Sequence, residues 1–312
     1  MPHPADDHDN RPFNRIPLLR LSLLMLAVSL SPTAHADEKF RIVPDLAFAP
    51  HAPQLRLSLW LPARKGPLPC VLALQGGGFL PQTGNGYRGM AEYLASHGFA
   101  AALVAYRGRP DQQFPDTLAD VRAAAKFLKK NAHTWQLDTT KFAAIGGSAG
   151  GTLAALLATT ADETDPDCRI HAAVCFAGVF DFVSRFQDPL QLELQPAHAE
   201  KLKTNQEWIG APFAPTATAW LQASPLTHLS PGDPPILLLH SRNDSTVPWL
   251  QSQLCHNRMQ QLHLTSELII YPEGGHGVNP SNGKPRAEML RFLRQHLGVS
   301  QGQTETTADA KP

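Results

Sequence analysis

The sequence predicts an α/β fold in which helices cover both faces of a mostly parallel central sheet. From about residue 70 onward, short apolar runs alternate with longer segments whose apolar residues recur every three or four positions. Glycine-rich turns follow several of these runs. In a parallel sheet, the loops at the carboxyl ends of the strands form the ligand-binding edge. With 312 residues, 43% of them hydrophobic and 17% charged, the chain has the composition of a globular protein.

The expected strands follow from short runs of apolar residues. The run at 54–61 (QLRLSLWL) alternates with period two, which predicts an antiparallel edge strand ahead of the main sheet. Continuous apolar runs predict the parallel strands, at 71–74, 100–105, 142–145, 172–176, 236–240 and 267–271. Helical spacing predicts helices at 87–97, 117–131, 150–160, 247–262 and 284–296. Residues 181–232 lack an obvious strand and predict a helical insertion over the working edge, as a lid or binding wall.

The first 36 residues have the pattern of an export signal. Three arginines precede the apolar run 21–30, and Ala34-His35-Ala36 matches a small-x-small cleavage site before Asp37. The run is shorter than the roughly 20 apolar residues of a membrane span, so we expect cleavage and no stable membrane insertion. We therefore expect a signal peptide at 1–36, a folded domain at 37–298, a disordered tail at 299–312, and a periplasmic or extracellular location.

Charge and cysteine content limit the partners of the chain. Lysine plus arginine and aspartate plus glutamate number 27 each, and no basic cluster exceeds Lys129-Lys130, which argues against nucleic-acid binding. Export would allow disulfides among Cys70, Cys168, Cys175 and Cys255. Because two of these lie in apolar runs typical of buried thiols, we expect at most one bridge and assign none.

The predicted strand at 142–145 leads into Gly146-Gly147-Ser148-Ala149-Gly150-Gly151 and then into a predicted helix. This is a G-x-S-x-G motif in the strand–turn–helix context that exposes a nucleophilic serine. A glycine-rich phosphate cradle is the alternative, but no lysine or nucleotide motif follows. Ser148 is the candidate nucleophile.

A serine hydroxyl needs a base, and the base needs an acid to orient it. His276 lies on a glycine-rich turn (PEGGHG) after the last predicted strand, and Asp244 lies after the strand before it. Asp244 could instead cap the helix expected near Val247. The chain order Ser148, Asp244, His276 is that of a serine, acid and histidine triad on this kind of scaffold.

Acyl transfer also requires donors for an oxyanion. The predicted strand at 71–74 ends in QGGGF, where bare backbone can approach a ligand closely. We expect the N–H groups of Gly77, Gly78 and Ala149 to form the oxyanion hole, with a merely flexible loop as the alternative.

The chain resembles α/β-hydrolases of the carboxylesterase and acetylesterase kind, near the hormone-sensitive-lipase and the acetylxylan or feruloyl esterase-like (BD-FAE-like) groups. The matching stretches are QGGGF, VAYRGRPDQQFPDTLADV, IGGSAGG, SPLTHLSPGDPPILLLHSRNDSTVP and PEGGHG, which together span most of the expected mature chain. It implies the α/β-hydrolase fold with an eight-stranded sheet and catalytic roles for Ser148, Asp244 and His276. Gln75 stands where these families usually have histidine, and Ser241 where glycine is common.

The sequence therefore predicts an exported serine esterase that forms an acyl-enzyme and releases it by hydrolysis. The resemblance suggests short acyl groups, such as acetyl or cinnamoyl esters of plant polysaccharide, so the partner is a small-molecule or carbohydrate ester. We expect no cofactor and no metal, since no spacing such as H-E-x-x-H is present. The alternatives are a prolyl-oligopeptidase-like peptidase, which would need a gating domain larger than the short segment after Asp37, and a non-catalytic binding protein on the same scaffold.

Overall fold

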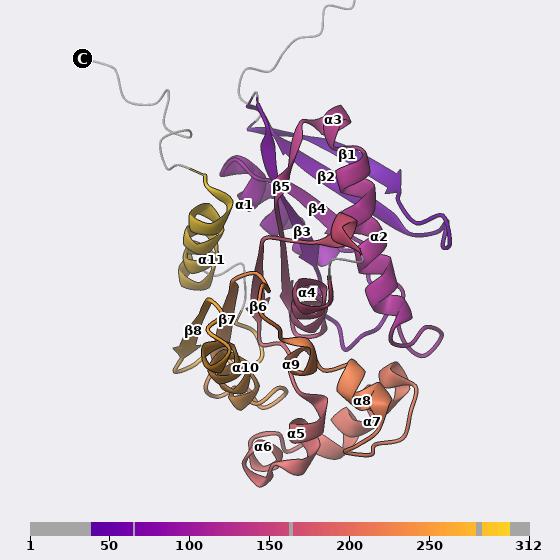
Figure 1. Ribbon diagram of the computed structural model, residues 1–312, viewed down its shortest axis with the longest axis vertical. Coiled ribbons are helices and arrows are strands. Elements are labelled where there is room, and N and C mark those ends of the chain that lie inside the picture. Colours follow the sequence, from indigo (N-terminus) through magenta and orange to yellow (C-terminus); the bar gives the residue numbers. More distant parts are fainter. Residues whose placement is uncertain (1–38, 65, 162–164, 279–282, 300–312) are drawn as a thin grey trace, which may run out of the picture. The chain divides into compact units, whose positions relative to one another are not determined.

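The computed structural model describes residues 39–64, 66–161, 165–278 and 283–299. The expected signal segment, and the expected tail apart from Val299, lie outside these residues. Eight strands form one sheet in the order β1-β2-β4-β3-β5-β6-β7-β8 (Figure 1). β2 is antiparallel to both β1 and β4, and the remaining pairs are parallel. This is the α/β-hydrolase fold that the sequence predicts.

All six strands that continuous apolar runs predict are present. They are β3 (Leu68–Leu74), β4 (Ala100–Val104), β5 (Leu137–Gly147), β6 (Ala172–Phe176), β7 (Ile236–Ser241) and β8 (Ser266–Tyr271). Most of them are buried on both faces, which explains why they read as continuous apolar runs.

The edge of the sheet differs from the expectation. β2 (Arg56–Pro62) is antiparallel as predicted, but it is not the edge, because β1 (Phe40–Ala47) pairs along its outer side. The sequence of β1 contains Pro44, and its register shifts between Val43 and Leu46, where Asp45 has a φ of 56°. Its residues are mostly exposed, so no apolar run marks it. Proline and a bulge are typical of edge strands and hide the strand pattern.

Helices cover both faces of the sheet. One face packs against α1 (Arg88–Ser96) and α11 (Gly283–Leu297). The other packs against α2 (Asp116–Lys130), the short α3 (Ala132–Trp135), α4 (Ala149–Thr160) and α10 (Leu250–Gln261). Neighbouring residues of β3 alternate between the two cores, with Val71 on one side and Leu72 on the other. Short 3₁₀ helices lie at Asn85–Tyr87 and Pro166–Cys168.

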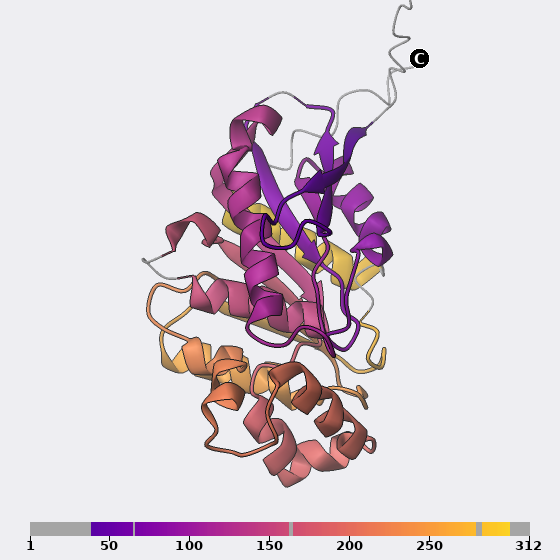
Figure 2. The same cartoon turned by 90° about the vertical axis from the view of Figure 1, so that its right-hand side faces the viewer.

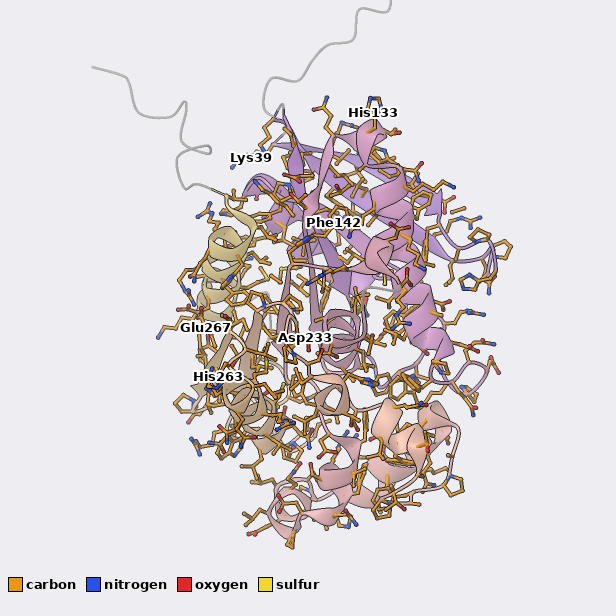
Figure 3. The ribbon with its side chains drawn as sticks, viewed as in Figure 1. Lys39, His133, Phe142, Asp233, His263 and Glu267 are labelled. Atoms are coloured by element: carbon orange, nitrogen blue, oxygen red, sulfur yellow. The ribbon has the colours of Figure 1, made fainter. Side chains whose placement is uncertain are left out.

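Between β6 and β7 the chain forms the expected helical insertion, which clusters at one end of the sheet in both views (Figures 1 and 2). Its helices are α5 (Phe182–Gln187), α6 (Pro189–Leu194), α7 (His198–Ile209), α8 (Thr218–Gln222) and α9 (Pro225–His228). Trp208 and Trp220 are fully buried among its aromatic rings. Exposed Lys39 and His133 lie at the opposite end of the sheet (Figure 3).

All four cysteines are buried and none is paired with another. Within the described ranges, no helix is long and apolar enough to cross a membrane.

Candidate active site

Ser148 lies on the sharp turn between β5 and α4. Its backbone has φ 52° and ψ −123°, a region that non-glycine residues rarely adopt. Such strain persists only where the surroundings enforce it, and here the Ser148 N–H donates to the carbonyl of Phe176 at 2.7 Å. A Cβ on Gly150 would overlap the carbonyl oxygen of Leu74, so helix α4 can begin this close to β3 only with glycine there. The G-x-S-x-G pattern thus holds the serine at the carboxyl edge of the sheet.

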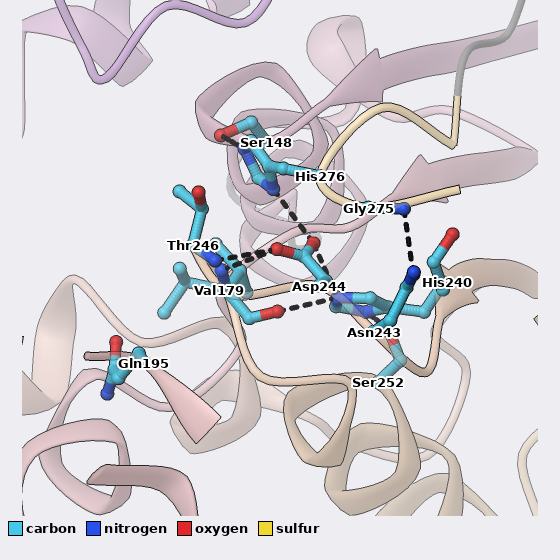
Figure 4. Close-up of polar contacts among 12 residues, drawn as sticks. Ser148, Val179, Gln195, His240, Asn243, Asp244, Thr246, Ser252, Gly275 and His276 are labelled. Carbon is cyan, nitrogen blue, oxygen red and sulfur yellow. Dashed lines mark hydrogen bonds and ion pairs between the residues drawn. The ribbon is translucent and has the colours of Figure 1, made fainter. Parts of the chain in front are cut away.

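The structure brings Ser148, His276 and Asp244 into one hydrogen-bonded chain (Figure 4). His276 Nε2 lies 2.9 Å from Ser148 Oγ, and His276 Nδ1 lies 2.8 Å from Asp244 Oδ2. The three residues follow β5, β7 and β8, whose carboxyl ends meet at the same edge. Because Asp244 accepts from Nδ1, the other ring nitrogen can accept the proton of the serine hydroxyl.

Asp244 is fully buried, yet its environment favours the ionised form. Burial alone would raise the pKa of this carboxyl. Hydrogen bonds from His240 and His276, with the backbone N–H of Val247, outweigh burial and hold the pKa of Asp244 well below its usual range. Oδ1 accepts the N–H groups of Thr246 and Val247, while Oδ2 faces the histidines. Asp244 therefore caps a turn as well, but helix α10 begins only at Leu250 rather than near Val247.

His240 is a buried partner of Asp244 that sequence reasoning did not single out. Its Nε2 lies 2.9 Å from the carbonyl of Val247 and 3.2 Å from Asp244 Oδ2, and both of these oxygens are acceptors. Nε2 therefore carries a proton, and Nδ1 can accept the hydroxyl of Ser252 at 2.7 Å. The only sequence signal was a histidine at the end of an apolar strand, four residues before the acid.

The expected oxyanion donors lie in the same cavity as Ser148 and His276. Gly77, Gly78 and Ala149 all line it. Gly77 and Gly78 have φ of 154° and 59°, which favour glycine, and Ala149 is the first residue of α4, where N–H groups have no acceptor within the helix. The macrodipole of α4 adds partial positive charge at this point.

Two contacts tie the glycine loop to helix α7. Arg109 Nε donates to the carbonyl of Gly78 at 2.8 Å, and its Nη1 pairs with Glu207 at 2.6 Å. The ring of Phe79 stacks on Trp208 with centroids 3.7 Å apart. Sequence reasoning missed these links because they join segments about 100 residues apart.

Gln75 and Ser241, which depart from the resemblance, have structural partners. Gln75 Oε1 accepts the N–H of Gly86, and its carbonyl accepts the hydroxyl of Tyr106. Ser241 donates to the carbonyl of Glu273 at 3.2 Å. Two residues further along the chain, Asn243 accepts the N–H of Gly275 at 2.8 Å (Figure 4). The bonds of Ser241 and Asn243 hold the turn that carries His276 against the loop that carries Asp244.

The cavity at this site has a volume of about 620 Å³, within the range of small-ligand pockets. Apolar side chains line part of it, namely Phe79, Phe176, Val179, Val247 and Val278, while Arg185 and the polar face of α7 line another part. In the described part of the chain, no three His, Cys, Asp or Glu side chains gather as metal ligands.

The model of the BD-FAE family matches residues 57–259, which is more than half of the chain. The chain belongs to the BD-FAE family. The chain is 33% identical over 219 residues to the probable carboxylic ester hydrolase LipM of Mycobacterium tuberculosis, covering 67% of this chain and 48% of LipM. It is 26% identical over 225 residues to the esterase LipQ of the same organism, covering 67% of this chain and 50% of LipQ.

Among solved structures, this BD-FAE chain is similar to a truncated carbohydrate esterase from gut microbiota. The TM-score is 0.70 at 20% identity, covering 84% of this chain and 99% of that chain. This likeness agrees with the α/β-hydrolase fold. The chain spans about half the length of the two curated relatives.

Proposed function

We propose that this protein is a serine carboxylesterase with Ser148 as nucleophile, His276 as general base and acid, and Asp244 as the acid that orients the histidine. The observation that carries the proposal is the hydrogen-bonded chain from Ser148 Oγ through both ring nitrogens of His276 to the buried Asp244. Membership of the BD-FAE family and the similarity to ester hydrolases support it.

In the first half-reaction, Ser148 Oγ attacks the ester carbonyl while His276 Nε2 takes its proton. The N–H groups of Gly77, Gly78 and Ala149 stabilise the oxyanion, at about 3 kcal/mol for each donor. The C–O bond to the alcohol breaks, the alcohol leaves with the proton from His276, and the acyl group remains on Ser148. Water then attacks the acyl-enzyme while His276 Nε2 takes a proton from it. The bond between the acyl group and Ser148 Oγ breaks, His276 gives the proton to Ser148 Oγ, and the carboxylic acid leaves.

We further propose short-chain acyl esters as substrates, including acetyl or feruloyl esters of plant polysaccharide. The volume of the cavity, about 620 Å³, supports a small substrate, and its polar wall suits a hydrophilic alcohol. Export through cleavage after Ala36 is part of this proposal, and an N-terminus of the exported protein at Asp37 would support it.

The test is hydrolysis of p-nitrophenyl esters from acetate to decanoate, together with acetate release from acetylated xylan. We expect activity on short chains that falls roughly 10⁴-fold or more in Ser148→Ala. Ser96→Ala, a serine on α1 away from the cavity, is the matched control and should retain full activity. Faster cleavage of proline-linked chromogenic peptides would favour the peptidase alternative. Absence of any Ser148-dependent turnover would favour the binding protein.

A further inference from the structure

The wall that the insertion contributes to the cavity carries positive charge. Arg185 comes from α5, and Lys201, Thr204 and Asn205 come from α7. The α7 residues share one side of the helix, because positions three and four apart lie next to each other on a helix. Cationic, amide and hydroxyl donors therefore face the same cavity as Ser148.

Arg185 is 97% buried, with an exposed fraction of 3%. Its guanidinium donates to the side-chain oxygens of Gln195 and Asn205 at 3.1 Å each, and to the carbonyl of Thr246 at 2.7 Å. These three acceptors are neutral. A guanidinium has five N–H donors, so two remain beyond these bonds. Burial lowers the pKa of Arg185 to about 10, so the group is still a cation at neutral pH.

No carboxylate of the described residues is in direct contact with this cation. Asp244 attracts it from farther away, but both oxygens of Asp244 are already bonded to two histidines and two backbone N–H groups. A buried cation with only neutral partners carries a desolvation penalty. An anion from outside the chain would offset that penalty by pairing with it.

Lys201 adds a second cation to the wall. It is half-buried, and within the described residues it has no ion pair with a carboxylate. Glu200 also lines the cavity but is exposed. It lies four positions before Thr204 on the same helix, so it brings one negative charge to this wall beside the two cations.

We propose that Arg185 and Lys201 form a subsite for the carboxylate of an ester substrate that carries one, on either its acyl or its alcohol part. The inference rests on the proposed esterase function of Ser148 and adds a substrate class to it. The carboxylate takes no part in the bond changes. Water supplies the hydroxyl of the acid product and the proton of the alcohol product, as in any ester hydrolysis.

The test compares substrates that differ only in charge. For the acyl part, the pair is monoethyl glutarate and ethyl glutaramate. For the alcohol part, it is 3-acetoxypropanoate and 3-acetoxypropanamide. The readout is the ratio of kcat/KM for the carboxylate to kcat/KM for its amide. We expect a ratio of about ten in one of the two pairs, and that pair tells which part of the substrate carries the anion.

Variants of helix α7 then test the residues. Lys201→Gln should lower the ratio several-fold, and Glu200→Gln should raise it, because it removes a negative charge from the same wall. Lys203→Gln is the matched control, since Lys203 is exposed and does not line the cavity. Arg185→Gln should lower the ratio as well. Because Arg185 also holds the loop of Thr246, Lys201→Gln serves where the Arg185 variant does not fold.

A ratio of one or less in both pairs would overturn the inference, as would a ratio that Lys201→Gln leaves unchanged. A merely structural role of the wall would lower turnover of both members of a pair together and leave the ratio constant. If the esters that carry an amide are hydrolysed in a Ser148-dependent way as fast as the esters that carry a carboxylate, only the proposed subsite is refuted. If no ester of either kind is hydrolysed, the proposed function fails.

Discussion

Gly76 offers a sensitive test of the oxyanion loop, because it lies where that loop passes the nucleophile turn. A Cβ at this position would overlap the carbonyl oxygen of Gly147 and lie 3.2 Å from Cβ of Ser148. Since these atoms belong to the backbone of Gly147 and to the first side-chain atom of Ser148, they cannot rotate aside, and Gly76→Ala should move the loop by roughly 1 Å. A displacement of that size at an active site costs about 100-fold in rate. We expect kcat/KM on p-nitrophenyl acetate to fall by about 100-fold, mainly through kcat.

Gly89→Ala on helix α1 is the control, because its Cβ would meet nothing within 4 Å. Thermal unfolding of both variants shows whether the fold is retained. A folded Gly76→Ala enzyme with kcat/KM within a factor of about three of wild type would refute the assignment of the loop.

Other predictions concern the arginine link, the acid and the thiols. Arg109→Met should lower kcat by about tenfold with little change in KM, because the carbonyl of Gly78 loses its donor, and steady-state kinetics measure the split. A pKa of Asp244 below that of the unfolded chain contributes stability above about pH 4, which is lost as the pH falls through the folded pKa. The stability advantage of wild type over Asp244→Asn in urea unfolding should therefore shrink below about pH 4. Burial raises the pKa of Cys168 to about 11 and of Cys255 to about 12, so Ellman's reagent should label native protein slowly and find four thiols after unfolding without reductant.

The sequence was sufficient for the parts of the fold that depend on local pattern. Buried parallel strands are apolar along their whole length, so β6 is found with both ends correct. β1 could not be predicted, because Pro44 and the mostly exposed side chains erase both the apolar run and the alternation. What the structure adds is its antiparallel backbone pairing with β2.

The residues of the candidate site that could be predicted are likewise those with a local sequence pattern. Ser148, Asp244 and His276 are visible in the sequence because each follows a strand, and parallel strands end at a common edge. Arg109 and Arg185 could not be found, because their partners Glu207 and Asn205 lie in an insertion whose packing has no local signature. His240 gave only a weak signal, as a histidine near the end of a buried apolar strand.

The most direct test of the central claim is active-site labelling with a fluorophosphonate, followed by intact mass and peptide mapping. We expect one adduct per chain, on the peptide that contains Ser148. The adduct should form more slowly in Asp244→Asn and be absent from Ser148→Ala. Folded wild-type protein that stays unlabelled, or that carries the adduct on another residue, would contradict the central claim.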